Sequence, residues 1–455
     1  MNHSTISKEQ ILRILSLGKR RLLALGASGV GMSGLCALLA EQGHEVYCYD
    51  RDPTPLLQMS EGRFTLLLER EQVRPEAYDL VFYSLAMQQS WESVLEGVPS
   101  ASRAQMLGAL MGEYEHSIGV SGSHGKSTVT ALLDHIFAAS GLSPTTLVGA
   151  RLPSGLTYRI GSRGLFVCEA CEYRNAFLHL SPSVFLFLNL ELDHTDCFEN
   201  IEKLIASFVK AGEQAHRVIL NFDDENLKKV KNNLQNDAIT FGFSAECDYR
   251  AEWCREGGCL YPFLLYHHGV LIGEVHPSLM GMHGARNTLA AVVAAMEEGV
   301  SFADACACLS RFRGIARRLE HIGVFGGHDV YYDYAHHPTE IEASIRAIAQ
   351  RHHALPTVVF APHTYTRTRD LWAGFVNSLS LARRALIAPI FAARESPLPD
   401  VTSERLAREI GRGAHAVESA EELVKSLGAR EPIVLMGAGD LSPFLQAVTQ
   451  STDAR

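Results

Sequence analysis

The chain has 455 residues, a length that accommodates about three domains, each with its own buried core. Apolar residues make up 47% of the sequence and charged residues 20%, as is typical of soluble globular proteins. The net charge of −10 excludes a general attraction to nucleic acid or to an anionic membrane, so we expect no nucleic-acid partner and local cationic sites for any phosphate-bearing substrate.

The N-terminal segment, residues 1–17, has the pattern of an amphipathic helix and lacks the basic stretch and continuous apolar core of a signal peptide. No run approaches the length of about 18 apolar residues that spans a bilayer, so we expect no membrane insertion and a cytoplasmic location. The ten cysteines are scattered, and no second pair accompanies Cys168 and Cys171 at the spacing of a zinc site. We therefore expect free thiols in the core.

The first predicted unit is a βαβ element with a glycine loop. Its strands are Leu22–Leu25 and Glu45–Tyr49, and the loop between them contains G-x-G-x-x-G at residues 29–34. Asp50 follows the second strand, where an acid contacts a ribose in many nucleotide-binding proteins. The pattern fits NAD, FAD, a UDP-sugar, or simply close helix–strand packing. With a further strand at Leu80–Ser84, it predicts an α/β domain over residues 1–108.

A phosphate-binding loop lies at residues 119–128, with the sequence G-V-S-G-S-H-G-K-S-T. Its glycines let successive N–H groups point inward, and the helix predicted from residue 129 adds the positive end of its dipole. Lys126 is expected to reach the β- and γ-phosphates, and Ser127 or Thr128 to bind Mg²⁺. Five residues rather than four separate the first and last glycines. The alternative is a glycine-rich turn that only caps a helix.

Polar residues follow two further apolar strands of this central region. Leu165–Val167 leads to Glu169, and Val184–Leu188 leads to N-L-E-L-D-H-T-D at residues 189–196. Because ligands bind beyond the carboxyl ends of parallel strands, these residues are expected to face the phosphate loop and hold one or two Mg²⁺ ions. The alternative is a polar loop with a helix-capping aspartate. Short hairpins at 246–276 and a helix at 282–296 complete a predicted ATP-binding domain over residues 109–315.

The alternation of strands and helices restarts near residue 316. Four predicted strands end in histidine, arginine, glutamate or a glycine turn, as at a substrate-facing edge: Val330–Tyr332, Thr357–Phe360, Leu386–Pro389 and Ile433–Met436. A third domain with ordinary exposed loops is the alternative. The predicted fold is thus α/β with three domains: a Rossmann-like N-terminal domain, a central P-loop ATPase-type domain with a mostly parallel sheet, and a Rossmann-like domain over residues 316–455.

In these motifs and their order, the chain resembles the Mur ligases of peptidoglycan synthesis over nearly its whole length. The shared motifs are G-V-G-M-S-G at 29–34, G-S-H-G-K-S-T at 122–128, E-A-C-E at 169–172, F-L-H-L at 177–180, N-L-E-L-D-H-T-D at 189–196, R-R-L-E at 317–320, D-Y-A-H-H-P at 333–338, P-H-T-Y-T-R-T at 362–368 and M-G-A-G-D at 436–440. The resemblance implies a monomer or weak dimer that uses ATP and Mg²⁺ to join L-alanine to the carboxylate of UDP-N-acetylmuramate through an acyl phosphate.

The resemblance also implies roles for individual residues. The expected ATP-binding residues are Gly122, Ser123, His124, Gly125, Lys126, Ser127, Thr128, His283, Asn287, Arg318 and Asp333. The expected UDP-sugar-binding residues are Gly26, Ser28, Gly29, Val30, Gly31, Met32, Ser33 and Asp50. The muramoyl and amino-acid region would contain His336, His337, His363, Tyr365, Arg367 and Arg394. The metal ligands would be Ser127, Glu169 and His194, and the catalytic residues Lys126, His194, Arg318 and His337.

Three other functions are considered. The first two predicted domains also resemble those of a ligase that recycles murein tripeptide, but the P-H-T-Y-T-R-T segment at 362–368 favours the alanine-adding branch of the family. A nicotinamide or flavin oxidoreductase would leave Lys126 and the acidic residues unused. A non-catalytic nucleotide-binding homologue would have no need of Lys126, Glu169 and His194 together. The sequence leaves open whether alanine, glycine or serine is preferred. The family's H-N-x-x-N near the adenine reads H-G-A-R-N at residues 283–287.

Overall fold

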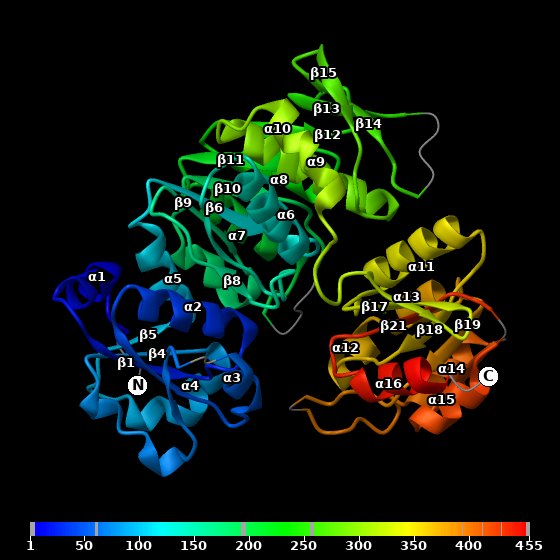
Figure 1. The fold of residues 1–455 in the computed structure, drawn as a ribbon, viewed down its shortest axis with the longest axis horizontal. Helices are drawn as coiled ribbons and strands as arrows, with labels where there is room; N and C mark the ends of the chain where they lie inside the picture. Colours follow the sequence, from blue (N-terminus) through cyan, green and yellow to red (C-terminus); the bar gives the residue numbers. More distant parts are fainter. Residues whose placement is uncertain are drawn as a thin grey trace. The chain divides into compact units, whose positions relative to one another are not determined.

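The computed structural model describes residues 5–59, 62–192, 197–254, 259–393, 395–411, 413–428 and 430–451. In these residues the chain forms three sheets flanked by helices, which confirms the predicted α/β class (Figure 1). Two compact units are distinguished, and they are interleaved along the chain. The first contains Met1–Glu252, Leu265–Gly273 and Asn287–Phe312, and the second contains Trp253–Leu264, Glu274–Arg286 and Arg313–Arg455.

The first sheet is wholly parallel, with strand order β3-β2-β1-β4-β5. Its elements are α1 (Lys8–Ser16), β1 (Arg21–Leu25), α2 (Val30–Glu41), β2 (Glu45–Tyr49), α3 (Thr54–Met59), β3 (Thr65–Leu67), β4 (Leu80–Tyr83), α4 (Leu85–Trp91), β5 (Ser100–Ser102) and α5 (Arg103–Met111). The last four residues of β1 are buried, because a central parallel strand is covered on both faces. The glycine loop at residues 29–34 follows β1 of this sheet, whereas the phosphate loop follows a strand of the second sheet, which is described next.

The second sheet has the order β15-β14-β13-β12-β11-β10-β6-β9-β7-β8 among the described strands. Its strands are β6 (His116–Ser121), β7 (Thr145–Leu147), β8 (Tyr158–Arg159), β9 (Leu165–Glu169), β10 (Val184–Phe187), β11 (Arg217–Asn221), β12 (Ala238–Gly242), β13 (Tyr249–Trp253), β14 (Phe263–His267) and β15 (Val270–Val275). Its helices are α6 (Lys126–Ala139), α7 (Ile201–Gly212), α8 (Glu225–Asn233), α9 (Gly281–Glu297) and α10 (Phe302–Ala307). The strands from β13 to β7 are parallel neighbours, so their carboxyl ends share one edge.

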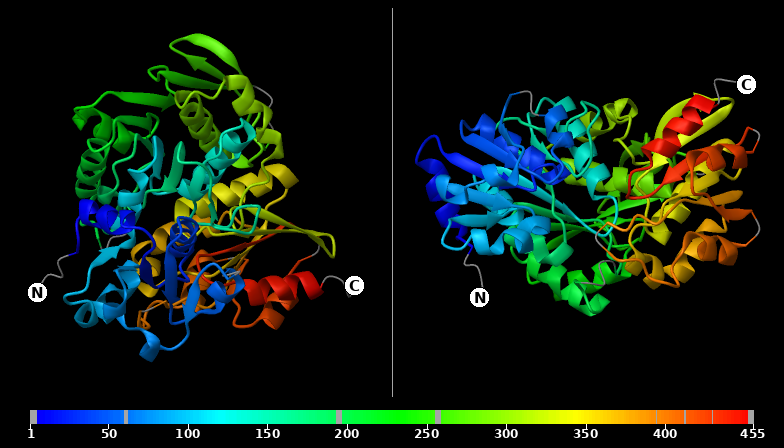
Figure 2. Two further views of the ribbon diagram at one scale, coloured as in Figure 1. Left: turned by 60° about the vertical axis from the view of Figure 1, so that its left-hand side comes forward. Right: turned by 90° about the horizontal axis from the view of Figure 1, so that it is seen from below.

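The third sheet has the order β16-β17-β21-β18-β19-β20, with only β16 antiparallel to its neighbour. Its strands are β16 (Glu320–Phe325), β17 (His328–Asp333), β18 (Thr357–Phe360), β19 (Arg384–Ile387), β20 (Ala414–Ala416) and β21 (Ile433–Met436). Its helices are α11 (Pro338–His352), α12 (Tyr365–Asp370), α13 (Trp372–Leu379), α14 (Ser403–Ile410), α15 (Ala420–Ser426) and α16 (Ser442–Ser451). Helices α11, α13 and α14 cover one face of this sheet, and α15 and α16 cover the other (Figure 2).

Most predicted elements lie where the sequence placed them, but several differ at their ends. The strands β2, β18 and β21 have the predicted bounds, whereas β19 begins at Arg384 and ends at Ile387 instead of spanning the predicted Leu386–Pro389. Helix α6 begins at Lys126 rather than at residue 129, so the lysine is part of its first turn. All ten cysteines are free thiols, as predicted, but only five of them are buried, so the expected core location is confirmed for half of them. No described helix is long and apolar enough to cross a membrane.

Candidate active site

The phosphate loop joins β6 to α6 through two glycines with positive φ. Gly122 has φ of 141° and Gly125 has φ of 85°, and Gly125 is the N-cap of α6. A Cβ atom on Gly125 would lie 2.7 Å from Oδ1 of Asn287 in α9. Both the backbone conformation and the close neighbour therefore require glycine at this position.

Lys126 is held inside the loop by its own backbone and by an acid. Its Nζ atom donates hydrogen bonds to the carbonyls of Gly122 and Ser123 and lies 3.1 Å from Oε1 of Glu172. Burial by itself lowers the pKa of Lys126, but the nearby Glu172 carboxylate, with a contribution from Glu169, raises it on balance above its ordinary value. The loop therefore keeps a fixed positive charge at its centre, with two acids close to it.

The segment after β10 is bonded directly to the phosphate loop, as predicted for residues 189–191. The Ser123 hydroxyl donates to the carbonyl of Glu191 and accepts from its N–H, both at 2.9 Å. The backbone N–H of His124 donates to Oδ1 of Asn189, whose amide in turn donates to the His124 carbonyl. Residues 193–196, which include the predicted ligand His194, lie outside the described residues.

Two of the predicted metal ligands lie on adjacent elements of this edge. Ser127 is buried in the first turn of α6, and Glu169 ends β9, which pairs in parallel with β6. One carboxylate oxygen of Glu169 accepts a hydrogen bond from the N–H of Gly149. A serine hydroxyl and a carboxylate are oxygen donors of the kind that Mg²⁺ prefers, so the residues present fit this ion.

The glycine loop between β1 and α2 is held to the end of β2 by a hydrogen bond to a carboxylate. The N–H of Ser28 donates to Oδ2 of Asp50 at 2.9 Å, and Gly29 is the N-cap of α2. The side chains of Met32 and Ser33 are buried, and the Ser33 hydroxyl lies 3.1 Å from that of Thr157 in a hydrogen bond. The side chains of these two predicted ligand-binding residues therefore pack into the core.

In the second unit, Arg317 and Arg318 occupy different environments. The Nη2 atom of Arg317 donates to the carbonyls of Gly437 and Gly439, and its guanidinium lies 4.8 Å from the ring centroid of Tyr332. Arg318 lies over the ring of Tyr334 and lowers the pKa of Asp333, although burial, the largest effect, raises that pKa overall. Arg317 thus fixes the glycine turn, a role that the sequence did not reveal.

Three of the predicted muramoyl and amino-acid residues form a connected group. The ring centroids of His336 and His363 are 6.3 Å apart, and Nη1 of Arg367 donates to Nδ1 of His363 at 3.3 Å. Burial, together with Arg367 and His336, lowers the pKa of His363 to about 4. His363 is therefore neutral at physiological pH. Tyr365 starts α12 beside this group, whereas Arg394 lies outside the described residues.

His337 and His283 belong to the same unit. His337 is the buried N-cap of α11, and Oε2 of Glu340 accepts hydrogen bonds from the N–H groups of His336 and His337. Burial lowers the pKa of His283, while nearby Asp333 and Glu340 act to raise it. His283 therefore lies close to Asp333. Asn287, one turn further along α9, belongs to the first unit and contacts the phosphate loop.

Glu172 and Asn189 contact the loop but received no individual role from the sequence. Both were inside recognised motifs, and Glu172 comes three residues after Glu169 at a strand exit. That spacing was the available signal for a second acid at the site. Its pairing with Lys126 depends on the parallel placement of β9 beside β6, which is a tertiary relationship.

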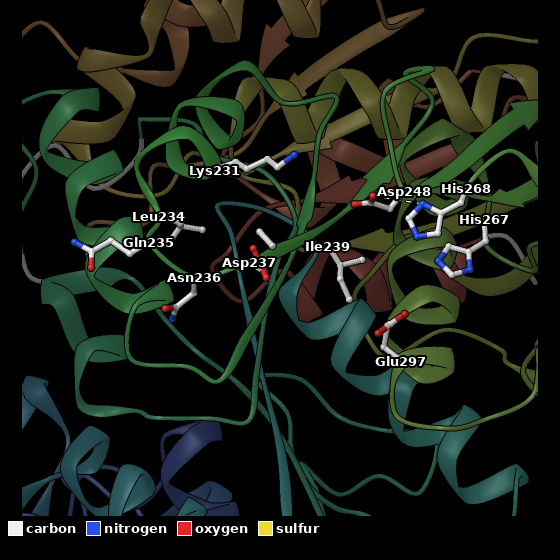
Figure 3. A pocket seen from close by; sticks show the side chains of 11 residues that line it. Lys231, Leu234, Gln235, Asn236, Asp237, Ile239, Asp248, His267, His268 and Glu297 are labelled. Atoms are coloured by element: carbon white, nitrogen blue, oxygen red, sulfur yellow. Dashed lines mark ion pairs between the residues drawn. The ribbon is translucent and has the colours of Figure 1, made fainter.

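A pocket of about 770 Å³ lies elsewhere in the first unit (Figure 3). Its residues Ala238, Asp248 and Glu297 stand at the amino ends of strands or the end of α9, so the pocket is at the edge of the sheet opposite the phosphate loop. Asp248 accepts two hydrogen bonds from Thr240, and Glu297 accepts from Tyr249 and Arg217. Because these carboxylates are already paired, we assign no ligand to this pocket.

Comparisons with known proteins agree in family and in fold. The profile described as the Mur ligase middle domain matches residues 120–295, and that of the Mur ligase glutamate ligase domain matches residues 317–439. The UDP-N-acetylmuramate–L-alanine ligase of Caldicellulosiruptor bescii is 31% identical, over 93% of this chain and 97% of the relative. That of Alkaliphilus metalliredigens is 33% identical, over 92% and 94% respectively.

Two solved structures show the same fold at lower identity. The UDP-N-acetylmuramate–alanine ligase of Thermotoga maritima superposes with a TM-score of 0.80 and 22% identity, over 96% of this chain and all of the other. The murein peptide ligase of Psychrobacter arcticus superposes with a TM-score of 0.72 and 23% identity, over 94% and 99%. The three-domain α/β arrangement is therefore shared with both proteins.

Proposed function

The chain belongs to the Mur ligase family, and we propose that it joins L-alanine to UDP-N-acetylmuramate in an ATP-dependent reaction of peptidoglycan synthesis. The products are UDP-N-acetylmuramoyl-L-alanine, ADP and phosphate. The choice of alanine follows the names of relatives that are about as long as this chain and align with nearly all of it.

One observation supports the proposed chemistry more than any other. Lys126 is a charged ammonium group in a glycine loop at the carboxyl edge of a parallel sheet, with Glu169 and Ser127 on adjacent elements. Loop N–H groups, a lysine and oxygen ligands for a cation are the groups that a nucleoside triphosphate with Mg²⁺ requires. We propose that residues 122–128 hold the phosphates of ATP.

The chemical problem is that a carboxylate is a poor electrophile, since its leaving group would be oxide. Transfer of the γ-phosphoryl group to the muramoyl carboxylate gives an acyl phosphate, and attack by the neutral amine of alanine then releases inorganic phosphate. Mg²⁺, when bound, would neutralise charge on the phosphates. Lys126 and Arg318 are proposed to stabilise the charge that develops during transfer, and most of the catalysis comes from positioning.

The remaining roles are assigned by region. We propose that domains divide at about residues 108 and 315, with the sugar nucleotide on the loop at 26–34 and on Asp50. His283 and Asn287 are proposed to border the adenine, and Asp333 the ribose. The group of His336, His337, His363, Tyr365, Arg367 and Arg394 is proposed to receive the muramoyl carboxylate and alanine, and His194 to complete the metal site.

We propose a monomer or weak dimer in the cytoplasm, where ATP and sugar nucleotides are made. No described helix is long and apolar enough to cross a membrane.

A coupled phosphate-release assay tests the proposal. The purified protein is given ATP, Mg²⁺ and UDP-N-acetylmuramate with a panel that contains L-alanine, glycine, L-serine and the murein tripeptide. The expected result is release that requires both the sugar nucleotide and L-alanine. Release with the tripeptide and not with alanine would favour the recycling activity, that of a murein peptide ligase such as the Psychrobacter arcticus protein. No release with any member of the panel would favour a non-catalytic homologue.

A further inference from the structure

Arg103 is a cation at the carboxyl edge of the N-terminal sheet that no sequence motif identified. It is the first residue of α5 and follows β5, which is two strands away from β1 in the sheet. The glycine loop after β1 lies at the same edge, because all five strands are parallel. The start of α5 is fixed by a capping box between Ser102 and Gln105, so the position of Arg103 is well defined.

The guanidinium group of Arg103 lies directly against the glycine loop. A Cβ atom built on Gly31 would be 2.6 Å from both Cζ and Nη2 of Arg103 and 2.7 Å from its Nε. Gly31 is the second residue of α2, where backbone N–H groups have no acceptor within the helix. The absence of a side chain at Gly31 thus lets a guanidinium and the first N–H groups of a helix approach the same space.

Arg103 has no partner for its charge among the described residues. Its Nε atom is buried without a hydrogen-bond acceptor, and none of the described residues forms an ion pair with the side chain. Its electrostatic neighbours are Cys168 and Cys171, and burial raises the pKa of these thiols to about 12 and about 11, so both are neutral. A buried donor without an acceptor costs free energy, and a bound anion would remove that cost.

We infer that Arg103 binds the diphosphate of the sugar nucleotide, together with the N-terminus of α2. This inference rests on the proposed function for the identity of the nucleotide. A guanidinium presents several N–H donors in one plane and suits two phosphate oxygens at once, whereas a lysine acts as a point charge. Arg103 is thereby a substrate-binding residue in addition to those of the glycine loop.

The test measures nucleotide binding without turnover. Affinities of the full-length protein for UDP and for UDP-N-acetylmuramate are measured by calorimetry in wild type, Arg103→Gln and Arg103→Lys, with ATP affinity as an internal check on folding. We expect Arg103→Gln to weaken both uridine nucleotides by about 10- to 100-fold, Arg103→Lys to recover part of the loss, and ATP affinity to stay unchanged. Arg21→Gln is the matched control, because Arg21 lies at the opposite, amino end of β1 and is exposed.

The two nucleotides distinguish the diphosphate from the muramoyl carboxylate, since UDP carries only the former. A loss for UDP-N-acetylmuramate with UDP unaffected would overturn the inference and place Arg103 on the sugar or its carboxylate. Wild-type affinity for both nucleotides in Arg103→Gln would also overturn it. If the wild-type protein itself failed to release phosphate with UDP-N-acetylmuramate and any amino acid, the proposed function would fail instead.

A second variant tests the contact through Gly31. The Gly31→Ala side chain would collide with the end of the flexible Arg103 side chain and displace it. If Gly31→Ala acts through Arg103, the double variant should bind UDP no more weakly than the weaker of the two single variants. If the losses of UDP affinity in the two single variants add fully in the double variant, the alanine at position 31 blocks the nucleotide directly. That result would contradict a shared site for Gly31 and Arg103. If Arg103→Gln fails to fold, Gly31→Ala alone still tests the contact, because it keeps the arginine and should weaken UDP binding while ATP affinity stays unchanged.

Discussion

Oε1 of Glu172 lies 3.1 Å from Nζ of Lys126, so the lysine of the phosphate loop is already paired with a buried acid before any nucleotide arrives. The Lys126 side chain is only 16% exposed, and its ammonium group also bonds to two carbonyls of its own loop. A bound triphosphate would have to draw the lysine away from part of this network or share it. The strength of phosphate binding is therefore set by Glu172 as well as by Lys126.

Replacement of Lys126 by alanine should remove most of the activity. The ammonium group is proposed to stabilise charge on the transferred phosphoryl group, and such a cation is worth about 3 kcal/mol in the barrier. We expect kcat/KM for phosphate release to fall at least about 100-fold. Because the change also leaves the buried Glu172 carboxylate without its partner, thermal unfolding should occur at a lower temperature, and rates are compared where circular dichroism shows the variant to be folded. Wild-type-like release that depends on UDP-N-acetylmuramate and alanine would contradict the assignment.

Replacement of Glu172 by glutamine should change the pH dependence of the reaction. Without the carboxylate, burial dominates and the pKa of Lys126 falls, because the effect that raises it is lost. The alkaline limb of the profile of kcat/KM for ATP should therefore move to lower pH. Glu225→Gln, which breaks an exposed pair with Lys228, is the control and should leave the profile in place. An unshifted alkaline limb in Glu172→Gln would show that Lys126 does not set it.

The two glycines that flank α6 allow a matched comparison. Gly125 and Gly141 have φ of 85° and 83°, but only at Gly125 would a Cβ meet another group, namely Asn287. Alanine at either position should lower the free energy of unfolding by about 1 kcal/mol, measured by urea denaturation. Only Gly125→Ala should also raise KM for ATP. Equal KM values in the two variants would argue against a role for this end of the helix in nucleotide binding.

The depressed pKa of His363 predicts a specific effect of acid on stability. In the folded protein this pKa is about 4, against an ordinary value of 6.5, so between these pH values the unfolded chain binds the extra proton. Stability should fall as the pH decreases from 6.5 toward 4, and His363→Gln should show a smaller fall over the same window. An NMR titration of the His363 ring with a midpoint near 6.5 would refute this expectation.

The strands and loops of this protein could be predicted because their signals are local. Thr357–Phe360 is a short apolar run that is buried on both faces, and the sequence placed it with its observed bounds. The contact between the phosphate loop and Asn189 also followed from sequence, since adjacent parallel strands end at one edge.

Other features of the site depend on tertiary contacts and had no local signal. In the sequence, Arg103 cannot be told apart from any other arginine at the start of a helix. Only the structure shows that its guanidinium lies against Gly31. Met32 and Ser33 are predicted to bind the sugar nucleotide because they belong to a motif, and the motif did not show that their side chains are buried in the core. Pairing of Arg317 with the carbonyls of Gly437 and Gly439 joins residues more than a hundred positions apart.

Helix α9 has a consequence for any attempt to dissect the protein. Its first six residues, up to Arg286, belong to the second unit, whereas the rest, from Asn287, belongs to the first. A fragment that starts at Arg313 would lack Trp253–Leu264 and Glu274–Arg286, and the complementary fragment would carry these two segments without the rest of the second unit. Two fragments divided at that junction should therefore be insoluble or unstable when expressed apart. Exchanging the second unit between homologues would require replacement of all three of its chain segments rather than one.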